Sequence, residues 1–136
     1  VFESSKKKWE LELNVWLSTY GVKPSPFKFP YEADDPSTGK RRTFHSTNDV
    51  MDVIERINEQ PRSVSRGQNL YYLTPLFSDQ SLLLSPKAQD YIRQYNLSKN
   101  FNLPIASSLG DASAELLDAF EIIENEINNC RKKDGN

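Results

Sequence analysis

The chain has 136 residues, of which 37% are hydrophobic and 26% are charged, and its net charge is −2. This length fits one globular domain, and this composition is typical of an apolar core beneath an ordinary charged surface. No apolar run approaches the roughly 18 residues of a membrane-spanning helix, and the start of the chain lacks the pattern of a signal peptide. We therefore expect no membrane partner.

The single cysteine, Cys130, and the single histidine, His45, limit the chemistry of the chain. One cysteine cannot form an internal disulfide, and neither residue type can complete a zinc site by itself. We expect no metal and no cofactor. Because no disulfide stabilises the fold, the chain is predicted to be intracellular, either cytoplasmic or nuclear. The first residue is Val1 rather than Met, so residues 1–136 are expected to be one domain excised from a longer protein.

The first segment is compatible with a strand or with a helix. Apolar and polar residues alternate over residues 9–15, which is the period of a half-buried strand. A helix places more of the apolar residues on one face, and Gly21 follows at a position typical of a helix end. We predict a helix over residues 4–20, with Leu11 and Val15 on the side opposite its main apolar face.

Residues 22–36 combine four prolines with three aromatic residues. Proline fixes φ and has no N–H, so this segment is predicted to be an extended strap rather than a central helix or strand. Its rings either anchor the strap on the core or offer a surface to a partner. A turn-forming cluster at residues 34–39 leads into a predicted strand at residues 40–45.

A helix is predicted over residues 48–60, because apolar residues recur at helical spacing and Pro61 stops it. Residues 62–69 have no periodicity and are predicted to form a loop. Two short strands follow, over residues 70–77 and 82–84, since tyrosine-rich and leucine-rich stretches favour β-structure. Ser85 and the proline after it then begin a helix over residues 86–96, with serine as the cap.

The clearest predicted element is a helix over residues 111–130. Its apolar positions recur at spacings of 3 and 4, which is the seam of a heptad pattern. The seam contains Ser113, Leu116, Phe120, Ile123, Ile127 and Cys130. This segment has a charge of −6, whereas residues 1–110 have a charge of +2. A loop is expected over residues 97–110, and the polar end at residues 128–136 is expected to fray.

Together these elements predict an α+β fold, in which a small antiparallel sheet of about three short strands is packed by about four helices. Strands that are close in sequence usually pair antiparallel, and helices bury one face against such a sheet. The residues offer little for catalysis, since no nucleophile elbow, Walker loop or dinucleotide glycine pattern is present. An enzyme that uses His45 with nearby carboxylates is the least favoured function, and we expect the chain not to be an enzyme.

Surplus apolar positions favour protein interaction. One core of this size either covers both terminal helices or leaves apolar side chains for a partner. We favour a non-catalytic protein-interaction or regulatory domain that binds another protein or a second copy of itself through its terminal helices, with the strap as a further surface. The candidate residues are Leu11, Val15, Leu116, Phe120, Ile122, Ile123 and Ile127.

Binding of nucleic acid or of a ribonucleoprotein is the alternative. Basic clusters at residues 6–8, 40–42 and 62–99 offer charge for phosphate, and nearby rings offer stacking. The net charge of −2 is far from the basic character of a dedicated nucleic-acid domain. The candidate contacts are Lys6, Lys7, Lys8, Lys40, Arg41, Arg42, Arg62 and Arg66, with Phe44, Tyr71 and Tyr72 as stacking rings.

Overall fold

A computed structural model describes residues 8–101 and 114–134. Its elements in chain order are α1 (Lys8–Tyr20), β1 (Tyr31–Asp35), β2 (Lys40–Phe44), α2 (Thr47–Glu59), α3 (Arg66–Leu73), the 3₁₀ helices η2 (Thr74–Leu76) and η3 (Gln80–Leu83), α4 (Pro86–Phe101) and α5 (Ala114–Lys133). The α+β class is confirmed, but the described residues contain five α-helices and one two-stranded antiparallel sheet. No helix among these residues is long and apolar enough to cross a membrane.

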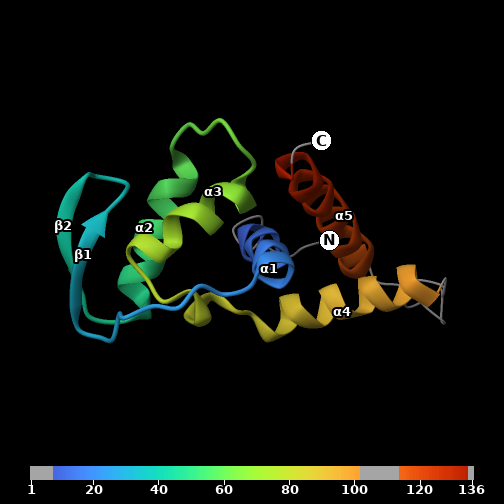
Figure 1. Cartoon of the computed structure of the whole chain (residues 1–136), viewed down its shortest axis with the longest axis horizontal. Helices are drawn as coiled ribbons and strands as arrows, with labels where there is room; N and C mark the ends of the chain where they lie inside the picture. Colours follow the sequence, from blue (N-terminus) through green and yellow to red (C-terminus); the bar gives the residue numbers. More distant parts are fainter. Residues whose placement is uncertain (1–7, 102–113, 135–136) are drawn as a thin grey trace.

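α1 is the central helix of the fold. It lies between α3, α4 and α5, as Figure 1 shows. The helix interpretation of the first segment is confirmed from residue 8 onward, whereas residues 1–7 lie outside the described residues. Trp16 and Leu13 are fully buried, and Gly21, with a φ of 90°, follows the last turn. The alternation that resembled a strand arises because α1 is apolar on several sides at once.

The sheet is a hairpin at one end of the molecule, beside α2 (Figure 1). Tyr31 pairs with Phe44, and Asp35 pairs with Lys40 next to the turn. The strand predicted at residues 40–45 is confirmed as β2. Its partner β1 lies in the segment that was expected to be part of the strap. β1 can form because residues 31–35, between Pro30 and Pro36, all have a backbone N–H that can donate a hydrogen bond to β2.

The aromatic residues of the strap anchor it to the core, so the first of the two interpretations is confirmed. The Tyr31 ring lies 4.6 Å from the ring of Phe27 and 5.4 Å from that of Phe29, measured between centroids. The stack continues through Phe44 to Phe77, with separations of 5.2 and 5.9 Å. The Tyr31 hydroxyl also donates to the Phe77 carbonyl oxygen at 2.7 Å, which fixes the strap to the segment after α3.

The strands predicted at residues 70–77 and 82–84 are wrong, because residues 70–76 and 82–83 belong to α3, η2 and η3, and residues 77 and 84 are in no strand. α3 also takes up the end of the predicted loop at residues 62–69. The Ser65 hydroxyl oxygen accepts a hydrogen bond from the Gln68 N–H, which caps α3. Packing of Leu70 and Tyr71 against α1 then overrides the β-propensity of the tyrosine-rich stretch.

Two other boundaries differ from prediction. α4 continues to Phe101 rather than ending at residue 96, so the start of the predicted loop at residues 97–110 is helical. α5 continues to Lys133, so residues 128–133 are helical where fraying was expected, and residues 135–136 lie outside the described residues. Cys130 is buried against α1, and this apolar contact holds the last turns of α5 in place. The rest of the predicted 97–110 loop and residues 111–113 of the predicted last helix lie outside the described residues.

A buried carboxylate, Glu126, joins three helices. Its Oε1 accepts from Trp16 Nε1 at 2.8 Å and from the Ser65 hydroxyl at 3.0 Å, and its Oε2 accepts from Asn129 Nδ2 at 2.8 Å. Gly67 lies against this carboxylate, and a Cβ there would approach Oε1 to 2.4 Å. Because buried polar groups need partners, this cluster requires α1, α3 and α5 to meet in one arrangement.

Polar contacts also link α4 to α5. Lys87 Nζ lies 3.0 Å from Glu115 Oε2, and Lys99 Nζ lies 3.4 Å from Glu124 Oε1. The Tyr95 hydroxyl donates to the same Glu124 oxygen. The hydrogen bond from Lys87 lowers the pKa of Glu115, and the hydrogen bond from Tyr95 lowers the pKa of Glu124.

We expect acid to weaken this contact between α4 and α5. Because the folded state lowers the pKa of Glu124, this carboxylate stabilises the fold above the pKa of an unfolded glutamate, and the stabilisation is lost as the pH falls through the folded value. The melting temperature should therefore fall as the pH is lowered from the pKa of an unfolded glutamate, about 4.3, through the lower folded pKa of Glu124. It should fall less steeply in Glu124→Gln, whereas the control Glu55→Gln, at an exposed position of α2, should follow the wild type. Identical slopes in both variants would contradict the assignment.

Candidate protein-interaction surface

The two residues predicted on the far side of the first helix, Leu11 and Val15, lie inside the core, with exposed fractions of 1% and 2%. The expectation that one core leaves them uncovered is wrong. α1 is in contact with α3, α4 and α5, so its second apolar side is covered like the first. A helix that other helices surround has no solvent face to offer a partner.

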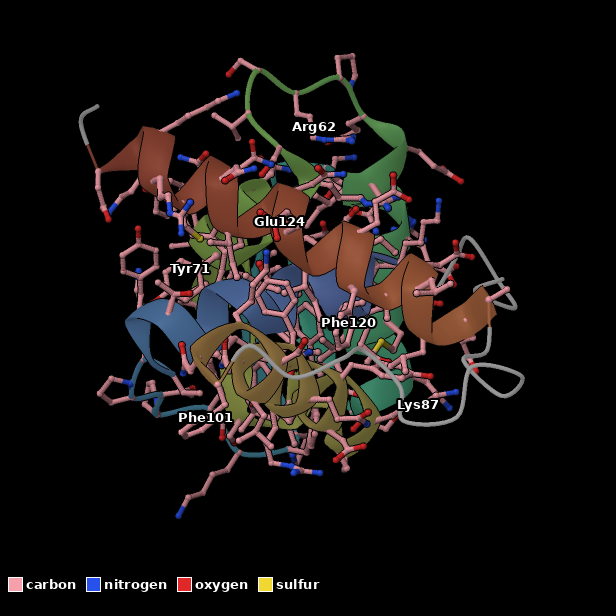
Figure 2. All side chains as sticks on the ribbon, turned by 90° about the vertical axis from the view of Figure 1, so that its right-hand side faces the viewer. Arg62, Tyr71, Lys87, Phe101, Phe120 and Glu124 are labelled. Atoms are coloured by element: carbon pink, nitrogen blue, oxygen red, sulfur yellow. The ribbon has the colours of Figure 1, made fainter. Side chains whose placement is uncertain are left out.

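The predicted residues of the last helix also face inward. Phe120 and Ile123 are buried, and Figure 2 shows Phe120 between α5 and α4, where its ring lies 5.4 Å from that of Tyr95. Three others are half-buried against the core: Leu116, Ile122 and Ile127. The heptad seam therefore holds α5 on α1 and α4. By contrast, the side chain of Leu117, beside the seam, is 45% exposed.

Most of the basic charge on the hairpin is paired with carboxylates. Lys40 is exposed, but Arg41 lies near two carboxylates of β1 and Arg42 lies near three from β1 and α2. These are Glu32 and Asp34 for Arg41, at 3.8 and 3.3 Å, and Asp35, Asp49 and Asp52 for Arg42, at 4.0, 3.1 and 3.5 Å. The His45 backbone N–H and the Arg42 guanidinium lower the pKa of Asp49. The carboxylates beside these two guanidinium groups therefore weaken their attraction for phosphate.

The other predicted nucleic-acid contacts are dispersed. Arg66 Nε lies 2.6 Å from Glu12 Oε1, whereas Arg62 is exposed on the loop before α3. Lys8 is exposed at the start of α1, and Lys6 and Lys7 lie outside the described residues. Of the three predicted stacking rings, Phe44 and Tyr71 are buried. The third ring, Tyr72, is accessible, with an exposed fraction of 42%.

His45 lies directly after β2, at the surface of the hairpin. It is exposed at the end of β2, and its backbone N–H donates to Asp49 Oδ2 at 2.8 Å. Within residues 8–101 and 114–134, no three His, Cys, Asp or Glu side chains are grouped so that they hold a metal ion. Cys130 is buried, and desolvation raises the pKa of its thiol to about 11, which disfavours the nucleophilic thiolate.

A different surface brings together tyrosines and lysines from three helices and one loop. We call it the tyrosine–lysine surface, and it contains Tyr20, Val22, Lys23, Tyr72, Leu76 and Lys133. Lys23 Nζ lies 5.0 Å from the ring centroid of Tyr71, which is buried below, and 5.9 Å from that of Tyr72. Lys133 Nζ lies 4.6 Å from the Tyr20 ring, which itself lies 6.0 Å from Tyr71. Val22 precedes Lys23, and Leu76 follows Tyr72 by one turn; both are exposed.

The charges of this surface differ from those of the hairpin. In the described part of the chain, neither Lys23 nor Lys133 has a carboxylate oxygen within 4 Å of its ammonium group. The Tyr20 hydroxyl donates toward Asp134 Oδ1, at 2.9 Å, and the carbonyl oxygen of Cys130, at 3.2 Å. Desolvation and the acceptor Asp134 raise the pKa of Tyr20 to about 12, so this hydroxyl remains protonated at neutral pH.

Sequence reasoning missed this surface because its residues come from three separate stretches of the chain, at residues 20–23, 72–76 and 133. Its one local signal is the pair Tyr71 and Tyr72, whose residue types predict a strand and rings that stack on bases. The helical conformation of α3 instead directs Tyr71 toward the Gly21 carbonyl oxygen, 2.8 Å from its hydroxyl, and leaves Tyr72 exposed. Comparisons of the chain with protein-family models, with curated proteins and with solved structures found no match.

Proposed function

We propose that the chain is a non-catalytic protein-interaction domain whose tyrosine–lysine surface binds an acidic segment of a partner protein. The observation that carries this proposal is the position of Lys23 and Lys133 over tyrosine rings, without carboxylate partners among the described residues. Exposed tyrosine is enriched at protein interfaces because one ring supplies a large apolar area and a hydrogen-bonding hydroxyl. The two ammonium groups add attraction for carboxylates.

The chemistry of the surface defines the kind of segment that fits. Val22, which precedes Lys23, and Leu76, one turn after Tyr72, supply exposed apolar area, with exposed fractions of 38% and 59%. A partner segment that alternates glutamate or aspartate with leucine-like side chains satisfies both features. Exposed ion pairs are each worth only up to about 1 kcal/mol, so we expect most of the affinity to come from the tyrosine and leucine contacts.

The nucleic-acid alternative has weaker support. Arg41, Arg42 and Arg66 are close to carboxylates, and the chain has a net charge of −2. Tyr72 next to Lys23 is an arrangement that also suits an unpaired base and its phosphate. Titration of a labelled single-stranded oligonucleotide at low salt separates the two functions, because salt-sensitive binding to it would favour the alternative.

We expect the double variant Lys23→Glu/Lys133→Glu to bind an acidic partner segment about tenfold more weakly than the wild type, a change of ~1.4 kcal/mol. The probe is a fluorescent helical peptide that alternates glutamate and leucine pairs, and the measurement is its fluorescence anisotropy. Tyr72→Ala should weaken binding by a similar factor through loss of its ring contact. The control is Lys28→Glu/Lys40→Glu, which makes the same change in net charge at exposed lysines of the strap and hairpin.

Affinity within twofold of the wild type is expected for the control variant. Equal losses in both double variants would show that only net charge matters, and the tyrosine–lysine surface would then not be the binding site. A wild-type chain that binds no acidic peptide at low salt would contradict the proposal. Circular dichroism of all variants establishes that each one is folded.

A further inference from the structure

The outer side of α5 carries one continuous stripe of exposed residues. Figure 2 shows this helix crossing the face of the molecule that is turned toward the viewer. The exposed positions at spacings of 4, 4, 3 and 4 are Leu117, Glu121, Asn125, Asn128 and Lys132. Because these spacings follow the helical period, the five side chains lie on one side of α5, away from the seam that packs on α1 and α4.

Charge is divided along this stripe. The first half contains Glu121, and the last turn contains Lys132 together with its basic neighbours Arg131 and Lys133. In the described part of the chain, Glu121 and Lys132 are exposed and form no ion pair. The stripe is therefore acidic at one end, amide-bearing in the middle and basic at the other end, over a helix about 30 Å long.

We propose that two copies of the chain associate through these stripes, with their α5 helices antiparallel. In this arrangement Glu121 of each copy faces Lys132 of the other, and Asn125 faces Asn128, so the contact closes about a two-fold axis. A parallel arrangement would place Glu121 against Glu121 and Lys132 against Lys132, and repulsion disfavours it. Antiparallel helices also bring opposite ends of their dipoles together.

The same arrangement brings Leu117 and Glu121 of one copy toward the end of α5 that borders the tyrosine–lysine surface of the other copy. Leu117 lies one turn before Glu121, so antiparallel pairing carries it beyond Lys132 of the other copy, toward the C-terminal end of α5, where Lys133 belongs to the tyrosine–lysine surface. The exposed Leu117 and Glu121 then match the apolar and acidic chemistry expected of the partner segment. The inference thus rests on the proposed function, and it names a second copy of the chain as the partner.

Charge-exchange variants test this pairing in sedimentation velocity experiments at concentrations up to about 1 mM. The wild type should show a concentration-dependent rise in mass toward twice the monomer, and added salt should reduce it. Glu121→Lys and Lys132→Glu should each remain monomeric, because each places like charges opposite one another. An equimolar mixture of the two variants should associate, because both contacts then join opposite charges. The matched controls Glu55→Lys and Lys28→Glu should behave as the wild type.

A wild type that stays monomeric at the highest concentration would overturn the inference, as would single variants that associate like the wild type or a mixture that does not associate. Peptide binding to Glu121→Lys reports the proposed function separately, since this variant keeps the tyrosine–lysine surface intact. If the peptide binds while the wild type stays monomeric, only the second copy is refuted as partner. If the peptide does not bind, the proposed function fails.

Discussion

Trp16→Ala is expected to lower the free energy of unfolding by about 4 kcal/mol, as is typical of a large aromatic residue removed from a core. Trp16 has an exposed fraction of 0% and lies where α1, α3 and α5 meet. Its ring contacts Tyr20 and Tyr71 at centroid distances of 5.4 and 6.0 Å, and its Nε1 donates to the buried carboxylate of Glu126. The variant loses apolar burial and leaves the carboxylate without one donor.

Urea denaturation followed by circular dichroism measures this loss, which is a large part of the 5–15 kcal/mol of a typical domain. Trp16→Phe is the matched comparison, because it keeps most of the ring but not the N–H. It should lose less than the alanine variant, and the remaining loss reports the hydrogen bond to Glu126 together with the smaller ring. A loss below about 1 kcal/mol in Trp16→Ala would show that this residue is not in the centre of the core.

Gly67→Ala is expected to lower the free energy of unfolding by about 2 kcal/mol, although alanine is the better helix former. An added Cβ would lie 2.4 Å from Glu126 Oε1, 2.9 Å from the Glu12 carbonyl oxygen and 3.0 Å from Trp16 Cδ1. The gain in helix propensity, about 1 kcal/mol, is smaller than the cost of moving a buried carboxylate away from its donors. Steric overlap therefore outweighs propensity at this position.

A double-mutant cycle with Glu126→Ala tests this explanation, because that change removes the atom that an added Cβ would approach most closely. Glu126→Ala alone should also destabilise the fold, since it leaves the Trp16, Ser65 and Asn129 donors without an acceptor. In its background, Gly67→Ala should cost less than in the wild type. A Gly67→Ala variant as stable as the wild type would instead mean that α3 can shift away from α1.

Several elements could be predicted because their signals are local. Proline positions delimit the strap and α2, and the Ser85 and Pro86 pair marks the beginning of α4. Helical spacing identifies the buried face of α2 and the seam of α5. These signals act through backbone geometry and amphipathic period, so they need no knowledge of distant residues.

The conformation of residues 70–84 required tertiary information. Tyr71, Tyr72 and the leucines that follow favour β-structure by propensity, but burial of Leu70 against α1 and the cap at Ser65 are stronger constraints. Gln80 is fully buried, and its Nε2 donates to the Tyr71 carbonyl oxygen at 3.0 Å, which holds η3 against the end of α3. The β-propensity of a residue depends on the side chains that it packs against, and these tertiary neighbours cannot be identified from the sequence alone.

By itself, the sequence predicted the α+β class, a strand at residues 40–45 and a long, acidic last helix. Only the tertiary structure decided which surfaces are available. It buried Leu11 and Val15 in a central helix, paired Arg41 and Arg42 with carboxylates, and left Lys23 above the tyrosine rings. The physical reason is that exposure and charge pairing depend on residues far apart in the chain, whereas caps, prolines and apolar period act within a few residues.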